Sequence, residues 1–247
     1  MEYYNSPTYG KVCKVAFGID LKQLGMMTMN ELDVLFAHSN FAKSQKILEV
    51  GCGAGHVAAY ISQKTSTRFL CIDVDEKVIS YATAAFKDNN NLCFRVLDVR
   101  RITEVKERFD KILAIDSLYF VSDMQADTYL ESLKTTITDL HALLDKGGEL
   151  IVFYSELPFF KPDKRSPECT QLGICLEELG LTYIAVDLTD GEIIFWREFK
   201  NALIKYKQEF IDEGSEELFS SNVSEAEFFI ESAEKGHLYR NLYLIKK

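Results

Sequence analysis

The sequence predicts an α/β protein with a doubly wound, mostly parallel sheet, and three observations lead to this fold class. A short apolar run, 47–50, is followed by a glycine-rich turn and a helical pattern, as at the start of a βαβ unit. Strand-like and helix-like patterns then alternate as far as residue 188. Three of the strand-like segments end in aspartate, at Asp73, Asp98 and Asp116. Aspartate is also good turn chemistry, but ligands bind at the carboxyl ends of parallel strands, so three together predict a shared site.

The glycine turn has the pattern Glu49-x-Gly51-x-Gly53-x-Gly55. A dinucleotide-binding turn, G-x-G-x-x-G, would need glycine at position 56, where this chain has His56. A carboxylate two residues before the first glycine suits a ligand with an amino group or a positive charge better than a pyrophosphate. We interpret His56 as part of the loop rather than as a base.

The first 40 residues are predicted to be helical and to lie outside the sheet. Ser6 and Pro7 can serve as the N-cap and first residue of one helix. Thr28 or Asn30 can cap a second helix.

From residue 46 onward, the apolar patterns predict a regular series of strands and helices. Strands are expected at 47–50, 67–72, 92–97, 111–115, 149–154, 181–188 and 238–245. Helices are expected around 57–61, 78–86, 130–144 and 172–179, the third closing at a Gly-Gly turn at 147–148.

Residues 189–236 interrupt the alternation with two helical segments. One carries an apolar stripe from Trp196 to Phe210 and ends at Gly214, and the other follows Ser224. We expect one domain over 1–247, with a Rossmann-like core at 44–188 and the last strand at 237–247. The segments 1–40 and 189–236 are expected to form a helical cap that closes over a small substrate.

Composition restricts the function further. A formal net charge of −10 argues against broad binding of nucleic-acid phosphates. The nearest approach to a basic cluster is Lys161, Lys164 and Arg165, which we interpret as a solvated loop. No apolar run approaches ~18 residues, so no membrane-spanning helix is expected. The N-terminus lacks a signal-peptide pattern, and the six scattered cysteines suggest buried free thiols, no metal site and a cytoplasmic protein.

Six segments, in order, resemble the motifs of class I S-adenosylmethionine-dependent methyltransferases. The first is the glycine loop, and the others read FLCIDVDEKVISYA, RVLDVRRI, FDKILAIDSLYFVSD, LLDKGGELIVFYS and YRNLYLIKK. The resemblance covers about residues 44–190 and the last strand. It implies a seven-stranded sheet whose last strand is antiparallel, and S-adenosylmethionine as the cofactor, with S-adenosylhomocysteine as its product.

The resemblance also implies roles for particular residues. Asp73 would hold the ribose hydroxyls, Asp98 would contact the adenine amino group beside Val99, and Asp116 and Ser117 would face the reacting centre. The expected cofactor-binding residues are Glu49, Gly51, Cys52, Gly53, Gly55, Asp73, Val74, Asp98, Val99, Asp116 and Ser117.

The acceptor is less well defined by the sequence. Tyr4, Tyr9, Tyr119 and Tyr154 are candidate substrate residues, because aromatic rings near a sulfonium or an amine give cation–π contacts. No catalytic base is named. The Asn/Asp-Pro-Pro motif typical of enzymes that methylate adenine or glutamine nitrogen is absent after Asp116. We therefore expect methyl transfer to nitrogen or oxygen of a small molecule, without a nucleic-acid or membrane partner. An RNA or protein methyltransferase and a non-catalytic cofactor-binding homologue stay open, as does the oligomeric state.

Overall fold

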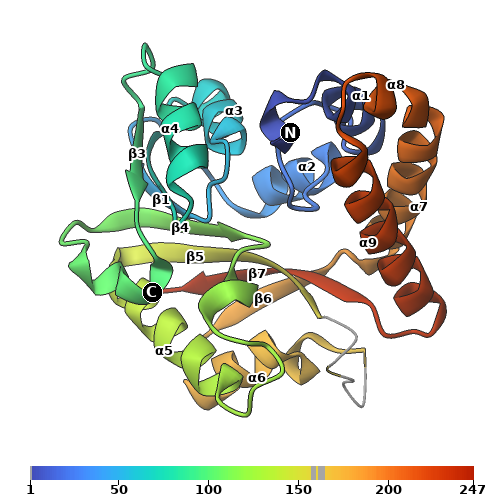
Figure 1. The fold of residues 1–247 in the computed structure, drawn as a ribbon. Coiled ribbons are helices and arrows are strands. Elements are labelled where there is room, and N and C mark those ends of the chain that lie inside the picture. The colour runs from blue at the N-terminus through green and yellow to red at the C-terminus, as the bar shows by residue number, and fades with distance from the viewer. Residues whose placement is uncertain (1, 157–159, 161–164) are drawn as a thin grey trace.

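The computed structural model describes residues 2–156, 160 and 165–247, and in this part of the chain one seven-stranded sheet forms the centre (Figure 1). The strand order is β3-β2-β1-β4-β5-β7-β6. The strands are β1 Lys46–Val50, β2 Arg68–Asp73, β3 Leu92–Val96, β4 Phe109–Ile115, β5 Leu144–Glu156, β6 Tyr183–Asp187 and β7 Tyr239–Lys246. Strands β1 to β5 pair in parallel, whereas β7 is antiparallel to both of its neighbours. The predicted fold class and the orientation of the last strand are confirmed.

Helices cover both faces of the sheet because successive strand residues point to opposite sides. Leu48 and Ile112 pack on one side with α5 (Tyr129–Ala142) and α6 (Gln171–Glu178). On the other face lie residues of α2, α3 and α4. These helices span Met29–His38, His56–Thr65 and Glu76–Ala85. The described residues also form short 3₁₀ helices: η1 Tyr3–Asn5, η2 Val99–Glu104, η3 Leu118–Val121 and η4 Pro167–Cys169.

The N-terminal helices begin where the sequence predicts. In α1 (Pro7–Ala16), the Ser6 side chain accepts a hydrogen bond from the Tyr9 N–H. Thr28 caps α2 in a capping box: its hydroxyl accepts from the Glu31 N–H, and the Glu31 carboxylate accepts from the Thr28 N–H.

Between β6 and β7 lie α7 (Thr189–Lys205), α8 (Lys207–Asp212) and α9 (Glu216–Glu234). The apolar stripe predicted as one helix is broken at Tyr206. The last of the three helices begins earlier than the pattern after Ser224 predicts, because Phe219 already packs against Phe210. Similarly, α5 ends before the Gly-Gly turn because Leu144 pairs with Phe109 in the sheet.

The helices α1, α7 and α9 share an apolar cluster built largely from aromatic rings. Tyr9 and Phe17 of the N-terminal segment pack against Phe199, and Trp196 stacks on Phe229 with ring centroids 4.3 Å apart. Segments from the two ends of the sequence thus lie side by side (Figure 1).

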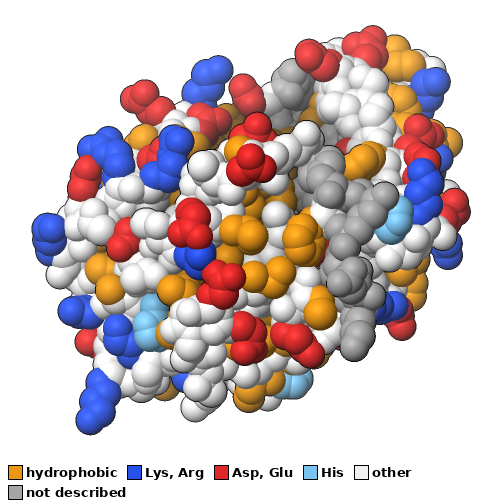
Figure 2. All heavy atoms as spheres, turned by 90° about the horizontal axis from the view of Figure 1, so that it is seen from below, with side chains coloured by type: hydrophobic (Ala, Val, Ile, Leu, Met, Phe, Trp, Pro, Cys, Tyr) orange, Lys and Arg blue, Asp and Glu red, His pale blue; other side chains and the backbone are white. Residues whose placement is uncertain are grey.

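Surface charge and cysteines are distributed as follows. Lys161 and Lys164 lie outside the described residues, and Arg165 is ion-paired to Asp187 and Asp190. On the face seen in Figure 2, acidic side chains lie between the basic ones. The described helices include none that is long and apolar enough to cross a membrane.

All six cysteines are free thiols. Cys93 is exposed and Cys169 is partly exposed, whereas the other four are buried, as the sequence suggests.

Candidate functional site

A cavity of about 450 Å³ lies at the carboxyl ends of β1, β2, β3 and β4. Its floor is the glycine loop that follows β1, and its sides are the segments 72–75, 97–100 and 115–117. Residues 21–25 of the N-terminal segment form the opposite wall. The fold therefore brings the ends of four neighbouring strands together under a covering segment from outside the sheet.

The glycine loop needs glycine for both backbone and space. Gly51 and Gly53 have φ angles of +71° and +50°, which side-chain-bearing residues rarely adopt. A Cβ atom on Gly51 would lie 2.4 Å from the Cβ of Ser117, and one on Gly53 would lie 3.1 Å from the hydroxyl of Tyr3. A side chain at Gly51 would therefore collide with Ser117, and one at Gly53 would crowd the Tyr3 hydroxyl and take up space in the cavity.

Asp73 braces the loop from the end of β2. Its Oδ2 accepts a hydrogen bond from the Gly53 N–H at 2.9 Å, and its Oδ1 accepts from the Asp75 N–H at 3.0 Å. Because a carboxylate has about four lone-pair positions, Asp73 keeps capacity to accept further hydrogen bonds from a ligand in the cavity.

Asp98, at the end of the third strand, is held by Arg100. The Arg100 N–H donates to Asp98 Oδ1 at 2.9 Å, and the Arg100 guanidinium bonds both carboxylate oxygens. These hydrogen bonds lower the pKa of Asp98. Asp98 is therefore ionised and fixed in orientation at neutral pH.

Glu49 lies beneath the loop and is 3% exposed. Burial, and then the charge of Asp73, raises its pKa to about 8. Within the described chain its Oε2 has no hydrogen-bond partner. Glu49 is therefore mostly protonated at pH 7.

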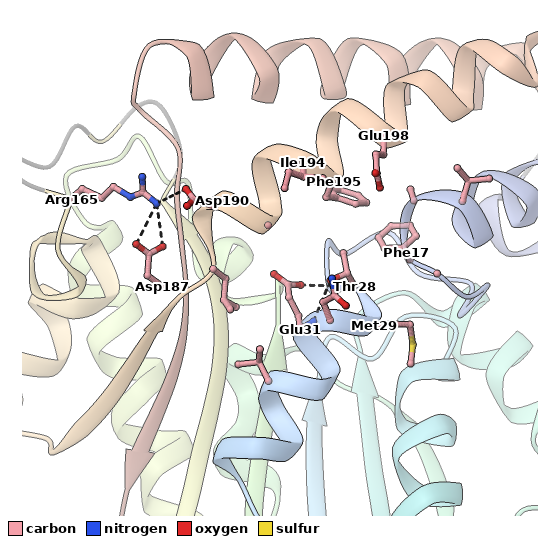
Figure 3. Close-up of a pocket in the computed structure, with 17 residues that line it drawn as sticks. Phe17, Thr28, Met29, Glu31, Arg165, Asp187, Asp190, Ile194, Phe195 and Glu198 are labelled. Carbon is pink, nitrogen blue, oxygen red and sulfur yellow. Dashed lines mark hydrogen bonds and ion pairs between the residues drawn. The ribbon is translucent and has the colours of Figure 1, made fainter.

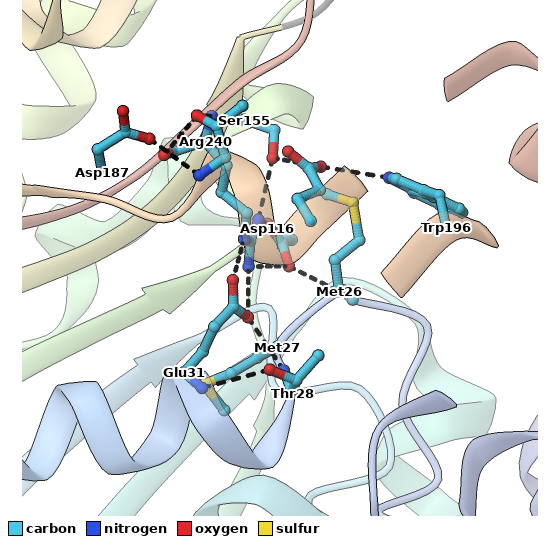
Figure 4. A network of polar contacts seen from close by, with 12 residues as sticks. Met26, Met27, Thr28, Glu31, Asp116, Ser155, Asp187, Trp196 and Arg240 are labelled. Atoms are coloured by element: carbon cyan, nitrogen blue, oxygen red, sulfur yellow. Dashed lines mark hydrogen bonds and ion pairs between the residues drawn. The ribbon is translucent and has the colours of Figure 1, made fainter. Parts of the chain in front are cut away.

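Asp116, at the end of β4, belongs to a buried polar network (Figure 4). Arg240 of β7 is fully buried and donates to Asp116 Oδ1 and Oδ2 at 2.6 and 3.2 Å. The Met26 N–H donates to Asp116 Oδ2 at 2.7 Å, and the Arg240 Nε donates to Glu31 at 2.7 Å. Asp116 thus links the cavity wall to α2 and to the last strand.

The structure groups nearly all of the expected cofactor residues around this cavity. Those lining it are Glu49, Gly51, Cys52, Gly53, Asp73, Val74, Asp98, Val99, Asp116 and Ser117. Gly55 does not line it; a Cβ there would lie 2.4 Å from a ring carbon of Phe94, so this glycine serves helix–strand packing.

None of the four candidate substrate tyrosines lines the cavity. Tyr4 is buried against Ala54 of the glycine loop and Val78 of α4, and Tyr9 is buried in the aromatic cluster shared by α1, α7 and α9. The Tyr119 hydroxyl accepts from the Ser155 N–H at 2.6 Å, and that of Tyr154 lies 3.1 Å from the Tyr129 hydroxyl. Their hydroxyls therefore have partners inside the protein, and the structure gives no support to direct contact with a ligand.

Several lining residues were not among those expected from the sequence. Tyr3 lies over Gly53, His56 lines the cavity from the start of α3, and Phe120, which is 78% exposed, lies at its margin. The wall formed by 21–25 had no sequence signal at all, since it is an irregular segment between two helices.

A second cavity, of about 570 Å³, lies between α1, α2 and α7 (Figure 3). Phe17, Phe195 and Ile194 contribute apolar surface, and Glu31 lies at its α2 side. It contains none of the glycine-loop residues. Glu31 is nevertheless shared, because it lines this cavity and also bonds Arg240.

Comparisons with known proteins agree with this geometry. Residues 47–148 match a family described as a methyltransferase domain. The ribosomal RNA small subunit methyltransferases C of Salmonella paratyphi B and Salmonella newport are each 34% identical over 151 residues. The match covers 58% of this chain and 43% of each relative, so the chain matches less than half the length of these curated relatives.

Solved structures show the same fold at low sequence identity. Phosphoethanolamine N-methyltransferase 2 of Haemonchus contortus, in complex with S-adenosylhomocysteine, has a TM-score of 0.75 at 14% identity, covering 99% of this chain and 59% of that one. The cyclopropane synthase MmaA2 of Mycobacterium tuberculosis has a TM-score of 0.75 at 11% identity, covering 100% and 96%.

Proposed function

We propose that this chain is a class I S-adenosylmethionine-dependent methyltransferase that transfers the methyl group of that cofactor to nitrogen or oxygen of a small molecule, because residues 47–148 match a methyltransferase domain and the fold matches that of a methyltransferase complex. The observation that carries this proposal is the cavity in which Glu49, Asp73 and Asp98 surround one glycine loop. Ligand binding at the carboxyl ends of parallel strands is the rule for such sheets.

The residues around the cavity fit the cofactor. The free lone pairs of Asp73 suit two ribose hydroxyls, and Asp98 with Val99 suits the amino group and ring of adenine. The buried Ser117 hydroxyl has no partner among the described residues and lies on the cavity wall, where it can bond the methionine end. A side chain at Gly51 or Gly53 would remove this space.

When bound, the cofactor supplies a methyl group that its sulfonium already makes electrophilic. The protein then has to position an acceptor in line with that group and exclude water, which contributes ~7–11 kcal/mol in well-oriented reactions. We assign this role to a cap formed by segments 1–40 and 189–236. Their packing on one another and the wall formed by 21–25 support this assignment.

Calorimetry and a transfer assay test the proposal. S-adenosylhomocysteine should bind the purified protein, and NAD should not. Incubation with a metabolite extract and methyl-labelled cofactor should then label a small molecule. Binding of NAD without binding of S-adenosylhomocysteine would overturn the cofactor assignment, and binding without any transfer would favour a non-catalytic homologue.

An RNA acceptor is the second candidate, because the curated relatives named above are ribosomal RNA methyltransferases. The net charge of −10 weighs against it, since phosphate backbones need clustered cations. Salt-sensitive retention of ribosomal RNA in a gel-shift experiment would favour the RNA acceptor over the small molecule. A protein acceptor would be recognised by label that stays with the macromolecular fraction.

A further inference from the structure

A buried carboxyl group, that of Glu192, lies outside the glycine loop, in the segment that we propose as part of the cap. Glu192 lies in the first turn of α7 and is 2% exposed. Its Oε1 accepts from the Ser155 hydroxyl at 2.8 Å and from the Trp196 indole N–H at 3.3 Å. Its Oε2 has no hydrogen-bond partner in the described parts of the chain. A buried carboxylate oxygen without a donor costs free energy unless a ligand or a proton satisfies it.

The charges around Glu192 do not balance. Among the described residues, Arg240 is the one cation of the network, and its guanidinium already bonds Asp116 and Glu31. Burial raises the pKa of Glu192 to about 7, Arg240 and Ser155 oppose this, and Asp116 and Glu31 add to it. The Tyr119 hydroxyl also faces this group of charges. Three carboxyl groups thus face one guanidinium. A second cation would bring the charges of this group closer to balance.

Met26 and Trp196, which lie beside this network, are suited to an organic cation (Figure 4). Met26 bonds Asp116 through its N–H, and its buried side chain packs in the same cluster as Trp196 and Phe195. Methionine side chains adapt readily to a ligand, and the face of an indole ring attracts cations. The neighbouring residues Gly25 and Met27 line the cofactor cavity. A ligand that displaces the Met26 side chain would therefore lie beside Asp116, which lines that cavity, and close to Trp196, which bonds Glu192.

We propose that Glu192 binds the ammonium group of the methyl acceptor, so that the acceptor is an amine held between Glu192, Asp116 and Trp196. This inference rests on the proposed function and adds to it the chemical class of the acceptor and a catalytic residue.

The reaction that follows is balanced in protons and electrons. The Glu192 carboxylate takes one proton from the ammonium group, which leaves a lone pair on the amine nitrogen. This lone pair forms the new bond to the methyl carbon as the carbon–sulfur bond breaks, and the electron pair of that bond stays on sulfur. The positive charge passes from the sulfonium to the methylated ammonium, and Glu192 releases its proton to solvent when the product leaves.

Trp196 allows a direct test, because it is the single tryptophan of the chain and bonds Glu192. Its fluorescence would be recorded in the S-adenosylhomocysteine complex during titration with butylammonium and 2-phenylethylammonium. The neutral isosteres butan-1-ol and 2-phenylethanol serve as the comparison. A saturable change with an ammonium ion, at least tenfold weaker with the matching alcohol, is expected. The response should grow as the pH rises through about 7, as Glu192 ionises.

Variants separate the outcomes. Glu192→Gln should weaken the ammonium response at least tenfold while calorimetry shows unchanged affinity for S-adenosylhomocysteine. The control Glu198→Gln, on the same helix but lining the second cavity, should behave like the wild type. If Glu192→Gln fails to fold, Ser155→Ala keeps the carboxylate and should move the pH midpoint of the response upward. No saturable response to either ammonium ion, an equal response to the alcohols, or an unchanged response in Glu192→Gln would overturn the proposal. A wild-type protein that does not bind S-adenosylhomocysteine would instead refute the proposed function.

Discussion

Arg240 on β7 holds Asp116, the residue that follows β4, through hydrogen bonds of 2.6 and 3.2 Å. These two residues come from strands that are not neighbours in the sheet, since β5 lies between β4 and β7. The guanidinium therefore spans the carboxyl end of β5 and connects the cavity at the glycine loop to the antiparallel part of the sheet. The same guanidinium also bonds Glu31 of α2.

Removing this guanidinium should strongly destabilise the protein. Arg240→Met leaves Asp116 and Glu31 buried without their cation, and breaking a buried ion pair in this way costs ~3–5 kcal/mol. Urea unfolding measures the change in the free energy of unfolding. Arg165→Met is the matched control, because Arg165 also pairs with two carboxylates but is 49% exposed. It should cost less than ~1 kcal/mol, and equal losses in the two variants would contradict the importance of burial.

Asp73→Ala should weaken binding of S-adenosylhomocysteine by roughly 10- to 100-fold. The variant removes the carboxylate that braces Gly53 and that we assign to the ribose hydroxyls, and hydrogen bonds to a charged group contribute ~1.5–3 kcal/mol. Asp110→Ala is the control, because Asp110 likewise accepts from a backbone N–H, that of Lys46, but at the amino end of the sheet. Calorimetry that finds the same affinity in the two variants would remove Asp73 from the site.

Gly53→Val should abolish cofactor binding while the protein still folds. The new side chain would point toward Tyr3 and fill part of the cavity. Gly180→Val is the comparison, since Gly180 also has a positive φ angle, +63°, but has no atom within 4 Å of a built Cβ. Both variants carry backbone strain, so circular dichroism should show similar losses of stability. A Gly53→Val protein that binds S-adenosylhomocysteine like Gly180→Val would show that the loop does not contact the ligand.

The buried Glu49 predicts a pH dependence of stability with a definite sign. Its pKa is about 8 in the folded protein and about 4.5 when exposed, so the folded state keeps a proton that the unfolded chain releases. Stability should therefore fall as the pH rises from about 5 to about 8, by at most ~1.4 kcal/mol per pH unit for this group. Glu49→Gln cannot ionise at this position and should make the slope of urea midpoints between pH 5.5 and 7.5 shallower, leaving the part that Glu192 contributes. The exposed Glu104→Gln should leave the slope as it is, and a wild-type slope retained in Glu49→Gln would contradict the assignment.

The parts of the fold that depend on local sequence could be predicted. The strand at 46–50 and the glycine loop after it are contiguous in sequence, and the capping box of Thr28 and Glu31 needs only three residues. The grouping of Asp73, Asp98 and Asp116 around one cavity could also be predicted, because parallel strands carry their carboxyl ends to one edge of the sheet.

Contacts between distant residues could not be predicted in the same way. Arg240 and Glu31 are 209 positions apart, and neither residue has a local pattern that marks it as a buried partner of the other. Tyr119 and Tyr154 show the opposite problem. Their positions after strands predict contact with a ligand. A hydroxyl group can bond any donor or acceptor nearby, however, and in this structure both hydroxyls bond groups inside the protein.

The pairing of β6 with β7 has an evolutionary consequence. Asp187 and Asn241 are partners in the sheet, so the chain leaves for α7 and returns from α9 at nearly the same point of one strand pair. An excursion that begins and ends at adjacent positions can lengthen, shorten or change sequence without altering the register of the strands beneath it. The glycine loop, Asp73 and Asp98 lie on other strand ends. With α7–α9 forming part of the acceptor site, as we propose, selection can change the accepted molecule while the residues around the glycine loop stay the same.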